Sequence, residues 1–157
     1  MTLSVPSVGS VAPDFALDST GGRLTLSSFR GKQHVLLAFF PAAFTSTCTA
    51  ELCAFTDDYA AFEASDVKVI PISVDGVPSL KEYRAKFAMS VDLASDFKRE
   101  VSRAYGTLLE APFLSNRAYF LIDKEGVLRW RFIEEHPGKL RANAEILAEI
   151  AKLTSEG

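Results

Sequence analysis

The sequence has little of what marks most specialised classes of protein. Two cysteines in 157 residues are too few for a disulfide scaffold. The 17 basic and 20 acidic side chains give a formal net charge of -3, which offers no basic surface for nucleic acid or an anionic membrane. No apolar run approaches the roughly 18 residues of a membrane span. Gly-rich phosphate loops and a Gly-x-Ser-x-Gly elbow are absent as well.

The organisation of the chain is simple. Residues 1–13 are small and polar, without the basic start and apolar centre of a signal peptide, so a cytoplasmic location is expected. There is no internal repeat, low-complexity tract or linker. The length therefore predicts a single domain over residues 1–157.

Short apolar runs predict the strands. Residues 35–40 (VLLAFF) and 67–74 (VKVIPISV) are typical of strands that are buried on both faces. Pro71 counts against a central position for the second run, because proline cannot donate to a strand ladder. Residues 118–123 and 127–133 flank a turn-like Lys-Glu-Gly and indicate a hairpin.

The segments between these runs have apolar residues at helical spacing. A helix is predicted from near Thr47, and others over residues 77–89 and 98–105, the last ending at Gly106. The apolar face of the first helix comprises Leu52, Phe55, Tyr59 and Phe62. One side of a final helix after Gly138 comprises Leu140, Ala144, Leu147 and Ala151. Alternating strands and helices, with the late hairpin, predict an α/β fold with a mixed central sheet flanked by helices.

The segment of residues 41–53 (PAAFTSTCTAELC) joins the first apolar strand to the first helix. Pro41 removes a backbone donor and ends the strand, and the hydroxyl residues 45–47 suit a helix start, with residue 46 or 47 as the cap. Cys48 then falls in the first turn, where unpaired amides and the helix dipole favour the thiolate. Because the thiolate is the nucleophile, Cys48 is a candidate reactive cysteine. The alternative is a buried cysteine that acts as a small hydrophobic residue.

Pro41, Thr45 and Cys48 match the Pro-x-x-x-Thr-x-x-Cys signature, and the sequence resembles the peroxiredoxin family. Residues 12–15 (APDF) agree with that family, and the resemblance extends over residues 8–153. Residues 39–41 (FFP) and 115–117 (SNR) are most similar to the bacterial BCP/PrxQ and AhpE-like branches. The resemblance implies a thioredoxin-like fold and a thiol-dependent reduction of hydrogen peroxide and organic hydroperoxides.

The resemblance also implies roles for individual residues. Cys48 would attack the peroxide and become a sulfenic acid. Thr45 would hold the peroxide, unless it is only a capping residue, and Pro41 would shield the sulfur from water. Arg117 would stabilise the thiolate and the leaving oxygen, whereas without the resemblance it would be taken for a surface charge. Glu51 would orient hydrogen bonds around the site.

The implied partners are a hydroperoxide substrate and a thioredoxin-like or other thiol reductant. The resemblance implies no cofactor and no metal, and it leaves a monomer or a homodimer open. The peroxide preference is also open. Phe44, Phe113 and Leu114 are candidates for an apolar rim that suits alkyl peroxides.

Cys53 lies five residues after Cys48, roughly 140° around the helix from the centre of its apolar face. Some BCP/PrxQ-type proteins carry their resolving cysteine at this spacing, and AhpE-like proteins with one working cysteine do not. Two Cα atoms five residues apart in a helix are about 8.6 Å from each other. A disulfide needs less than about 7 Å, so the helix start must unwind. The alternatives are an intermolecular disulfide or attack by an external thiol.

Three other functions fit the sequence less well or share its reactive thiolate. Zinc binding is poorly supported, because Cys-x4-Cys on one helix does not direct both sulfurs at one metal, and only His34 and His136 could assist. A thioredoxin-type oxidoreductase would need a second cysteine where Glu51 stands. A peroxide-sensing binding protein would use the same reactive thiolate. Sustained consumption of peroxide distinguishes the enzyme from that sensor.

Overall fold

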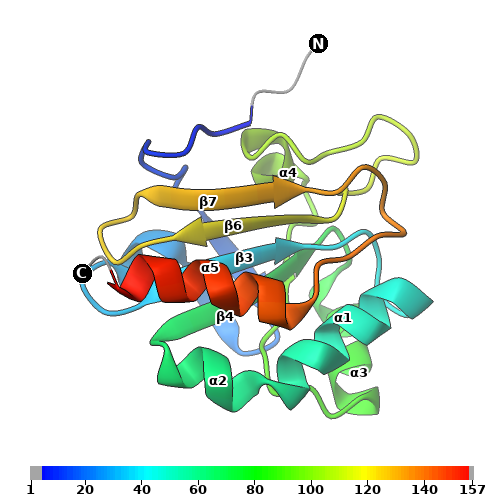
Figure 1. The fold of residues 1–157 in the computed structure, drawn as a ribbon. Coiled ribbons are helices and arrows are strands. Elements are labelled where there is room, and N and C mark those ends of the chain that lie inside the picture. Colours follow the sequence, from blue (N-terminus) through cyan, green and yellow to red (C-terminus); the bar gives the residue numbers. More distant parts are fainter. Residues whose placement is uncertain (1–4, 156–157) are drawn as a thin grey trace.

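The strands of the protein form one central sheet (Figure 1). The computed structural model describes residues 5–155, so residues 1–4 and 156–157 of the predicted 1–157 domain lie outside the described part. Within residues 5–155 the sheet has seven strands in the order β2-β1-β5-β4-β3-β6-β7. The strands are β1 (Ala16–Ser19), β2 (Gly22–Thr25), β3 (His34–Phe39), β4 (Val67–Ser73), β5 (Ala94–Ser95), β6 (Ala118–Ile122) and β7 (Leu128–Ile133).

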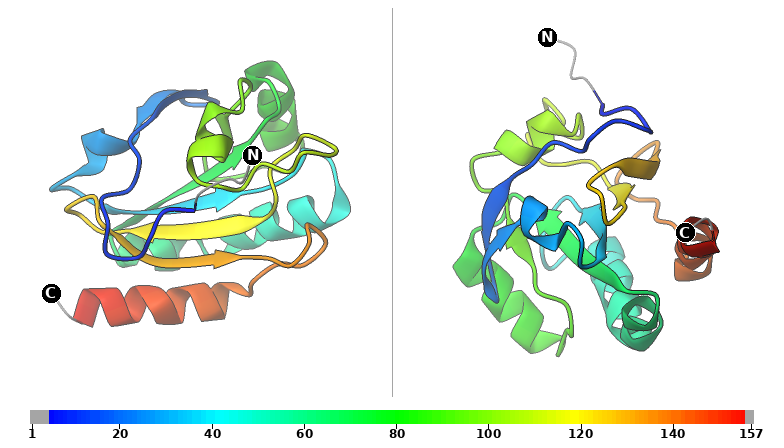
Figure 2. Two further views of the ribbon diagram at one scale, coloured as in Figure 1. Left: turned by 90° about the horizontal axis from the view of Figure 1, so that it is seen from above. Right: turned by 90° about the vertical axis from the view of Figure 1, so that its left-hand side faces the viewer.

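Helices cover both faces of the sheet. They are α1 (Ser46–Asp57), α2 (Tyr59–Ala64), α3 (Val77–Lys86), α4 (Glu100–Ala104) and α5 (Asn143–Ser155), with the 3-10 helix η1 (Leu26–Phe29). Helices α1, α2, α3 and α5 share one hydrophobic cluster, and α4 and η1 belong to the other. Figure 2 shows α5 on one side of the sheet, with α4 and the N-terminal segment on the opposite side. Among residues 5–155, no helix has the length and apolar character needed to cross a membrane.

Strand β3 is an interior strand of the sheet and is buried on both faces, as its apolar run predicts. Leu36 and Ala38 enter one hydrophobic cluster, while Leu37 and Phe39 enter the other. This division follows from the alternation of side chains along a strand. Strand β3 pairs in parallel with β4 and antiparallel with β6, so the predicted mixed sheet is confirmed.

Pro71 does lie inside a central strand, contrary to its usual preference. The carbonyl of Ile72 accepts a hydrogen bond from the Phe40 amide, so the backbone groups of Ile72 face β3. Those of Pro71 therefore face the other neighbour, β5. Strand β5 has two residues, and its ladder with β4 begins only at Ile72. The missing amide of Pro71 thus falls where no ladder bond is required.

The predicted helix through Phe62 is interrupted at Asp58, which separates α1 from α2. The side-chain amide of Asn143 binds at this junction and donates to the Ala54 carbonyl and the Asp58 carboxylate, each at 2.9 Å. A side chain that binds into the helix ladder is a common cause of such a break. Tyr59 consequently leaves the predicted apolar face and is 39% exposed.

The apolar face predicted for the last helix is only partly correct, because Leu147 is the one residue of the four that packs against the core. Helix α5 begins at Asn143, so Leu140 precedes it, and Ala144 and Ala151 are exposed. The residues that it buries are Ile146, Ile150 and Leu153. Helices α3 and α4 are shorter than predicted. Gly106 follows α4 with a φ of 70°, the left-handed conformation expected of a glycine at a helix end.

Candidate active site

The candidate site lies where β3 ends, β6 begins and α1 begins, at the right-hand side of Figure 1. Cys48 is in the first turn of α1 and is only 1% exposed, which agrees with its predicted position. The N-cap is Thr45, not residue 46 or 47, because the extended backbone of Thr45 (φ -91°, ψ 152°) lets the helix begin at Ser46. Cys48 therefore lies at the helix end whose first amides have no partner within the helix, where the helix dipole is positive.

Thr45 caps α1 with its backbone and not with its side chain. Its carbonyl accepts from the Thr49 amide at 2.9 Å and from the Thr49 hydroxyl at 2.7 Å. Its own hydroxyl donates to the Ala42 carbonyl at 2.8 Å, and the residue is exposed. The Thr45 hydroxyl is therefore not needed to satisfy the helix start.

Arg117 directs its guanidinium at the cysteine. Its Nη2 donates to Cys48 Sγ at 3.0 Å, and its Nη1 donates to Glu51 Oε1 at 2.8 Å. Its Nε and Nη2 also donate to the Pro137 carbonyl, at 3.1 and 3.0 Å. Arg117 is 1% exposed, so it is not a surface charge.

The sheet register explains why residues so distant in sequence meet. Strand β6 runs antiparallel to β3 with Ala118 opposite Phe39, so Arg117 lies at the end of β3 where the chain turns toward α1. On α1, Cys48 and Glu51 are three residues apart and occupy the same face. Both side chains thus come within reach of one arginine.

The charges in this buried group compensate one another. Burial raises the pKa of Glu51, which is 2% exposed, while Arg117 and a hydrogen bond from Tyr119 act in the opposite direction. Burial also opposes the charge of Arg117, but Glu51 and Cys48 raise the net pKa of its guanidinium above the ordinary value. Arg117 therefore remains a cation next to the sulfur. A charge-assisted hydrogen bond of this kind stabilises a thiolate.

Three contributors to the site were given no role in the sequence analysis, although Asn116 belongs to the family-like residues 115–117. Tyr119 donates to Glu51 Oε2 at 2.5 Å, Asn116 Oδ1 accepts from the Arg117 amide at 2.8 Å, and Pro137 provides the carbonyl described above. The alternation of strand residues could have indicated Tyr119, because it lies two residues after Arg117 and so shares its face. The Pro137 carbonyl has no signature in the sequence, since every residue carries one.

The loop before α1 is tied to the end of β4. The Ala43 amide donates to Asp75 Oδ2 at 2.8 Å, and the Ser73 hydroxyl donates to the same oxygen at 2.7 Å. Parallel strands β3 and β4 end at the same edge of the sheet, so Asp75 lies beside this loop. Pro41 in the same loop is half-buried. The loop is thus held in place from the neighbouring strand.

Cys53 is the second free cysteine of α1 and is partly exposed. Burial, and then the nearby carboxylate of Asp57, raises the pKa of the Cys53 thiol. In the intact helix Cys53 is therefore mainly in the neutral thiol form at neutral pH, and this form is less nucleophilic than the thiolate. Its place away from the buried face agrees with the sequence prediction.

The three residues considered for an apolar rim differ in their surroundings. Phe44 is 51% exposed and packs on the Tyr83 ring of α3, with centroids 4.8 Å apart. Phe113 is 41% exposed and lies under the guanidinium groups of Arg99 and Arg103. Leu114 is half-buried. Of these three residues, Phe44 and Phe113 are therefore the exposed ones.

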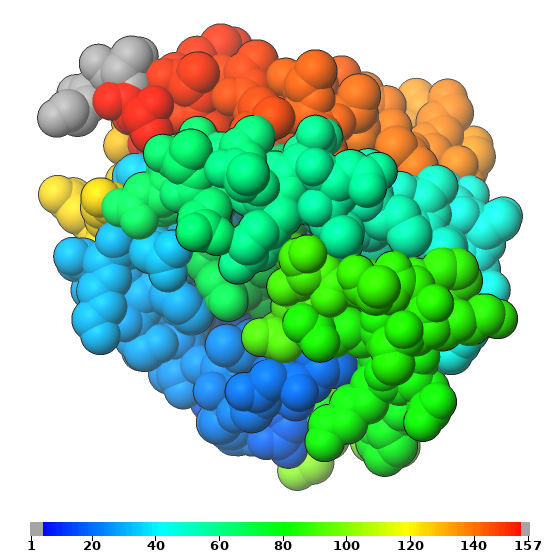
Figure 3. Space-filling view, turned by 90° about the horizontal axis from the view of Figure 1, so that it is seen from below, coloured from blue at the N-terminus to red at the C-terminus, as the bar shows by residue number. Residues whose placement is uncertain are grey.

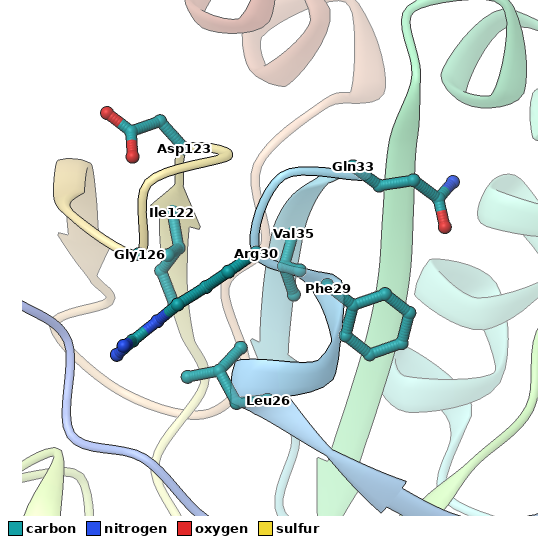
Figure 4. A pocket seen from close by; sticks show the side chains of 8 residues that line it. All are labelled: Leu26, Phe29, Arg30, Gln33, Val35, Ile122, Asp123 and Gly126. Atoms are coloured by element: carbon teal, nitrogen blue, oxygen red, sulfur yellow. The ribbon is translucent and has the colours of Figure 1, made fainter.

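A small hollow near the start of β3 lies at the other end of that strand from Cys48 (Figure 4). The Arg30 side chain extends across it toward Gly126. The hollow holds about 10 Å³, the space of a single water, which is too little for a substrate. Among residues 5–155, no group of three or more His, Cys, Asp or Glu side chains is placed to hold a metal ion.

Comparisons with known proteins agree with this geometry. The sequence pattern of the AhpC/TSA family matches residues 8–131. Alkyl hydroperoxide reductase E of Mycobacterium tuberculosis is 36% identical, over 95% of this chain and 99% of the relative. Peroxiredoxin 2 of Thermoplasma acidophilum is 32% identical, over 92% of this chain and 74% of the relative.

Solved structures give the same result for the fold. The reduced 2-Cys peroxiredoxin of Plasmodium vivax superposes with a TM-score of 0.89 at 29% identity, over 96% of this chain and 83% of that chain. The mitochondrial 2-Cys peroxiredoxin of Plasmodium falciparum gives a TM-score of 0.84 at 26% identity, over 94% of each chain. The chain therefore has the thioredoxin-like α/β fold, belongs to the AhpC/TSA family of peroxiredoxins and is a thiol-dependent peroxidase.

Proposed function

We propose that Cys48 is the peroxidatic cysteine, that its substrates are hydrogen peroxide and organic hydroperoxides, and that Cys53 resolves the oxidised Cys48 as an intramolecular disulfide. The observation that carries the first part is the 3.0 Å hydrogen bond from the buried Arg117 to Cys48 Sγ. It places a fixed positive charge where a thiolate must be stabilised. The cytoplasmic location and the monomeric or homodimeric state stay predictions.

In the first step the Cys48 thiolate attacks the distal oxygen of the peroxide. A sulfur–oxygen bond forms, the oxygen–oxygen bond breaks, and the leaving oxygen takes a proton to become water or an alcohol. Arg117 offsets the charge that develops on that oxygen. The Thr45 hydroxyl, released from the Ala42 carbonyl, can turn to the peroxide, since a hydroxyl both donates and accepts.

In the second step the Cys53 thiolate attacks the sulfenic sulfur. A disulfide forms, and the oxygen leaves as water after protonation. An intact helix holds the two Cα atoms about 8.6 Å apart, so the start of α1 must open. Opening exposes Cys53 to water and removes the burial that raises the pKa of its thiol. A thioredoxin-like dithiol then reduces the disulfide and returns both thiols.

Replacing Cys53 by serine tests this step. The variant should react with the first equivalent of peroxide at a near wild-type rate, because Cys53 takes no part in that attack. It should then stall as the Cys48 sulfenic acid and pass to the sulfinic acid under excess peroxide. Mass spectrometry after one equivalent distinguishes disulfide, sulfenic acid and dimer. Full thioredoxin-linked turnover in the variant would mean that an external thiol resolves Cys48.

Hydrogen exchange gives an independent measurement on the wild-type protein. Amides of residues 47–57 should exchange faster in the oxidised than in the reduced enzyme, because the disulfide cannot form while α1 is intact. Equal protection in both forms would exclude the intramolecular bond.

Tyr83 of α3 holds the start of α1 closed. Its hydroxyl is 2.9 Å from the Thr49 hydroxyl, and its ring packs on Phe44. The one proton of the Thr49 hydroxyl is used on the Thr45 carbonyl, so Tyr83 is the donor in this pair. Figure 3 shows α3, in green, against the start of α1, in cyan.

Replacing Tyr83 by phenylalanine should speed the formation of the Cys48–Cys53 disulfide. Loss of one net hydrogen bond of about 1 kcal/mol should raise the population of opened α1 about five-fold. Stopped-flow tryptophan fluorescence after a peroxide pulse measures the rate of the second step. Tyr59→Phe, on the exposed face of α2, is the control and should leave that rate unchanged. An equal rate in wild type and Tyr83→Phe would show that opening of α1 does not limit resolution.

A further inference from the structure

We propose that Tyr119 is a positioning residue for the peroxidase reaction. It keeps the Arg117–Glu51 ion pair monodentate, so that the second terminal nitrogen of Arg117 can bind Cys48. This inference rests on the proposed role of Cys48. Tyr119 lies on β6, is fully buried, and donates its hydroxyl proton to Glu51 Oε2.

Four side chains meet between one strand and one helix. Arg117 directly precedes β6 and Tyr119 lies within it, so the two are two residues apart and point to the same face, while Cys48 and Glu51 are three residues apart on α1. The strand pair and the helix pair therefore face each other across the buried interface. Within it, Glu51 Oε1 accepts from Arg117 and Glu51 Oε2 accepts from Tyr119.

The two carboxylate oxygens of Glu51 accept hydrogen bonds from two different residues. An arginine and a carboxylate prefer a bidentate arrangement, with two parallel N–H···O bonds. Here Tyr119 occupies the second oxygen of Glu51, so only Nη1 of Arg117 is used on the carboxylate. Nη2 is left to donate to Cys48 Sγ at 3.0 Å. Without the tyrosine hydroxyl, Glu51 could rotate, take both terminal nitrogens and draw Nη2 away from the sulfur.

The Arg141 backbone fixes the orientation of the Tyr119 hydroxyl. The hydroxyl oxygen accepts a hydrogen bond from the backbone amide of Arg141 at 3.0 Å. Since an amide can only donate, the hydroxyl must accept from it and send its own proton to Glu51. Burial and the Glu51 carboxylate also raise the pKa of Tyr119, so its hydroxyl stays protonated.

Arg141 is itself held in place. Its guanidinium donates to both oxygens of the buried Glu134, at 2.9 and 3.3 Å, and lies 4.4 Å over the Phe132 ring. The Glu134 amide donates in turn to the Arg117 carbonyl at 3.0 Å. The contacts from Tyr119 through Arg141 and Glu134 therefore lead back to the backbone of Arg117.

The test compares Tyr119→Phe with Tyr105→Phe. Tyr105 is equally buried, and its hydroxyl donates to the Pro13 carbonyl at 2.6 Å in the opposite hydrophobic cluster. Both variants lose one buried hydroxyl, so both should lose thermal stability. We expect the rate constant for hydrogen peroxide to fall about 10-fold in Tyr119→Phe alone, as for a misplaced electrostatic donor. A Tyr119→Phe rate within two-fold of wild type, or an equal loss in Tyr105→Phe, would overturn the proposal.

Two further measurements separate positioning from a structural effect. The pH dependence of Cys48 alkylation by iodoacetamide should move to higher pH in Tyr119→Phe and stay unchanged in Tyr105→Phe. In a Glu51→Gln background no carboxylate can take both nitrogens, so Tyr119→Phe should then have little additional effect on the peroxide rate. Additive losses would contradict the mechanism. Should Cys48→Ser retain peroxidase activity, the proposed function fails instead, whatever Tyr119→Phe does.

Discussion

Replacing Cys48 by serine should remove peroxide reduction entirely. A serine hydroxyl does not ionise near neutral pH, so the helix start and Arg117 would have no nucleophile to stabilise. The expected result is loss of the reaction with the first equivalent of peroxide, measured without a reductant, as well as of thioredoxin-linked peroxide consumption. Cys53→Ser is the matched control, because it also removes one thiol from α1 but should keep the reaction with the first equivalent. Turnover above a few per cent of wild type in Cys48→Ser would contradict the central assignment.

Replacing Arg117 by methionine should lower the peroxide rate constant by a factor of about 10² or more, the loss typical of a central electrostatic donor. Methionine retains much of the side-chain length but removes the charge and all four hydrogen bonds, to Cys48, Glu51 and twice to Pro137. The ultraviolet absorbance of the thiolate at neutral pH should fall in parallel. Arg103→Met, at an exposed position near Phe113, is the control and should keep the wild-type rate. An unchanged thiolate absorbance together with an unchanged rate would exclude this role of Arg117.

The stability of Arg117→Met should depend on pH differently from that of the wild-type protein. Burial raises the pKa of Glu51 above its usual value of 4.5, and Arg117 is the largest factor opposing that shift. Without Arg117 the folded-state pKa rises further, so the folded protein binds a proton that the unfolded chain releases. The free energy of unfolding of Arg117→Met should therefore fall as pH rises from 4.5 through the raised pKa, and recover toward acid pH. Urea denaturation at several pH values, with wild type in parallel, measures this difference. A constant difference between the two proteins would contradict it.

Much of the local structure of the site could be predicted, because its signals are local. The buried run of β3, the strand-ending Pro41 and the hydroxyl residues place Cys48 in a helical first turn without knowledge of the rest of the fold. Arg117 is different, since the chain has 17 basic residues and nothing near Arg117 distinguishes it. Only the resemblance to peroxiredoxins selected it, and in the structure its Nη2 donates to Cys48 Sγ. The family assignment also favours the enzyme over the peroxide-sensing binding protein that uses the same thiolate.

What could not be predicted depends on contacts between distant segments. The Tyr119 hydroxyl meets a carboxylate 68 positions away, and the break at Asp58 depends on a side chain of α5. The predicted face of α5 was correct only at Leu147, because Leu140 fits a helical spacing and yet precedes the helix. The hairpin of β1 and β2 was also missed. Its half-exposed residues lack the continuous apolar run that identifies β3.

The antiparallel register of β6 against β3 has a consequence for how the protein is made. Cys48 and its arginine are separated by 69 positions, and the register of Ala118 opposite Phe39 brings them together. Synthesis runs from the N-terminus, so the cysteine leaves the ribosome long before its partner does. A nascent chain that ends before β6 has the thiol but no cation beside it. If Cys48 has the role proposed above, we expect its reactivity toward peroxide to appear only when β6 has paired with β3 and brought Arg117 beside the sulfur.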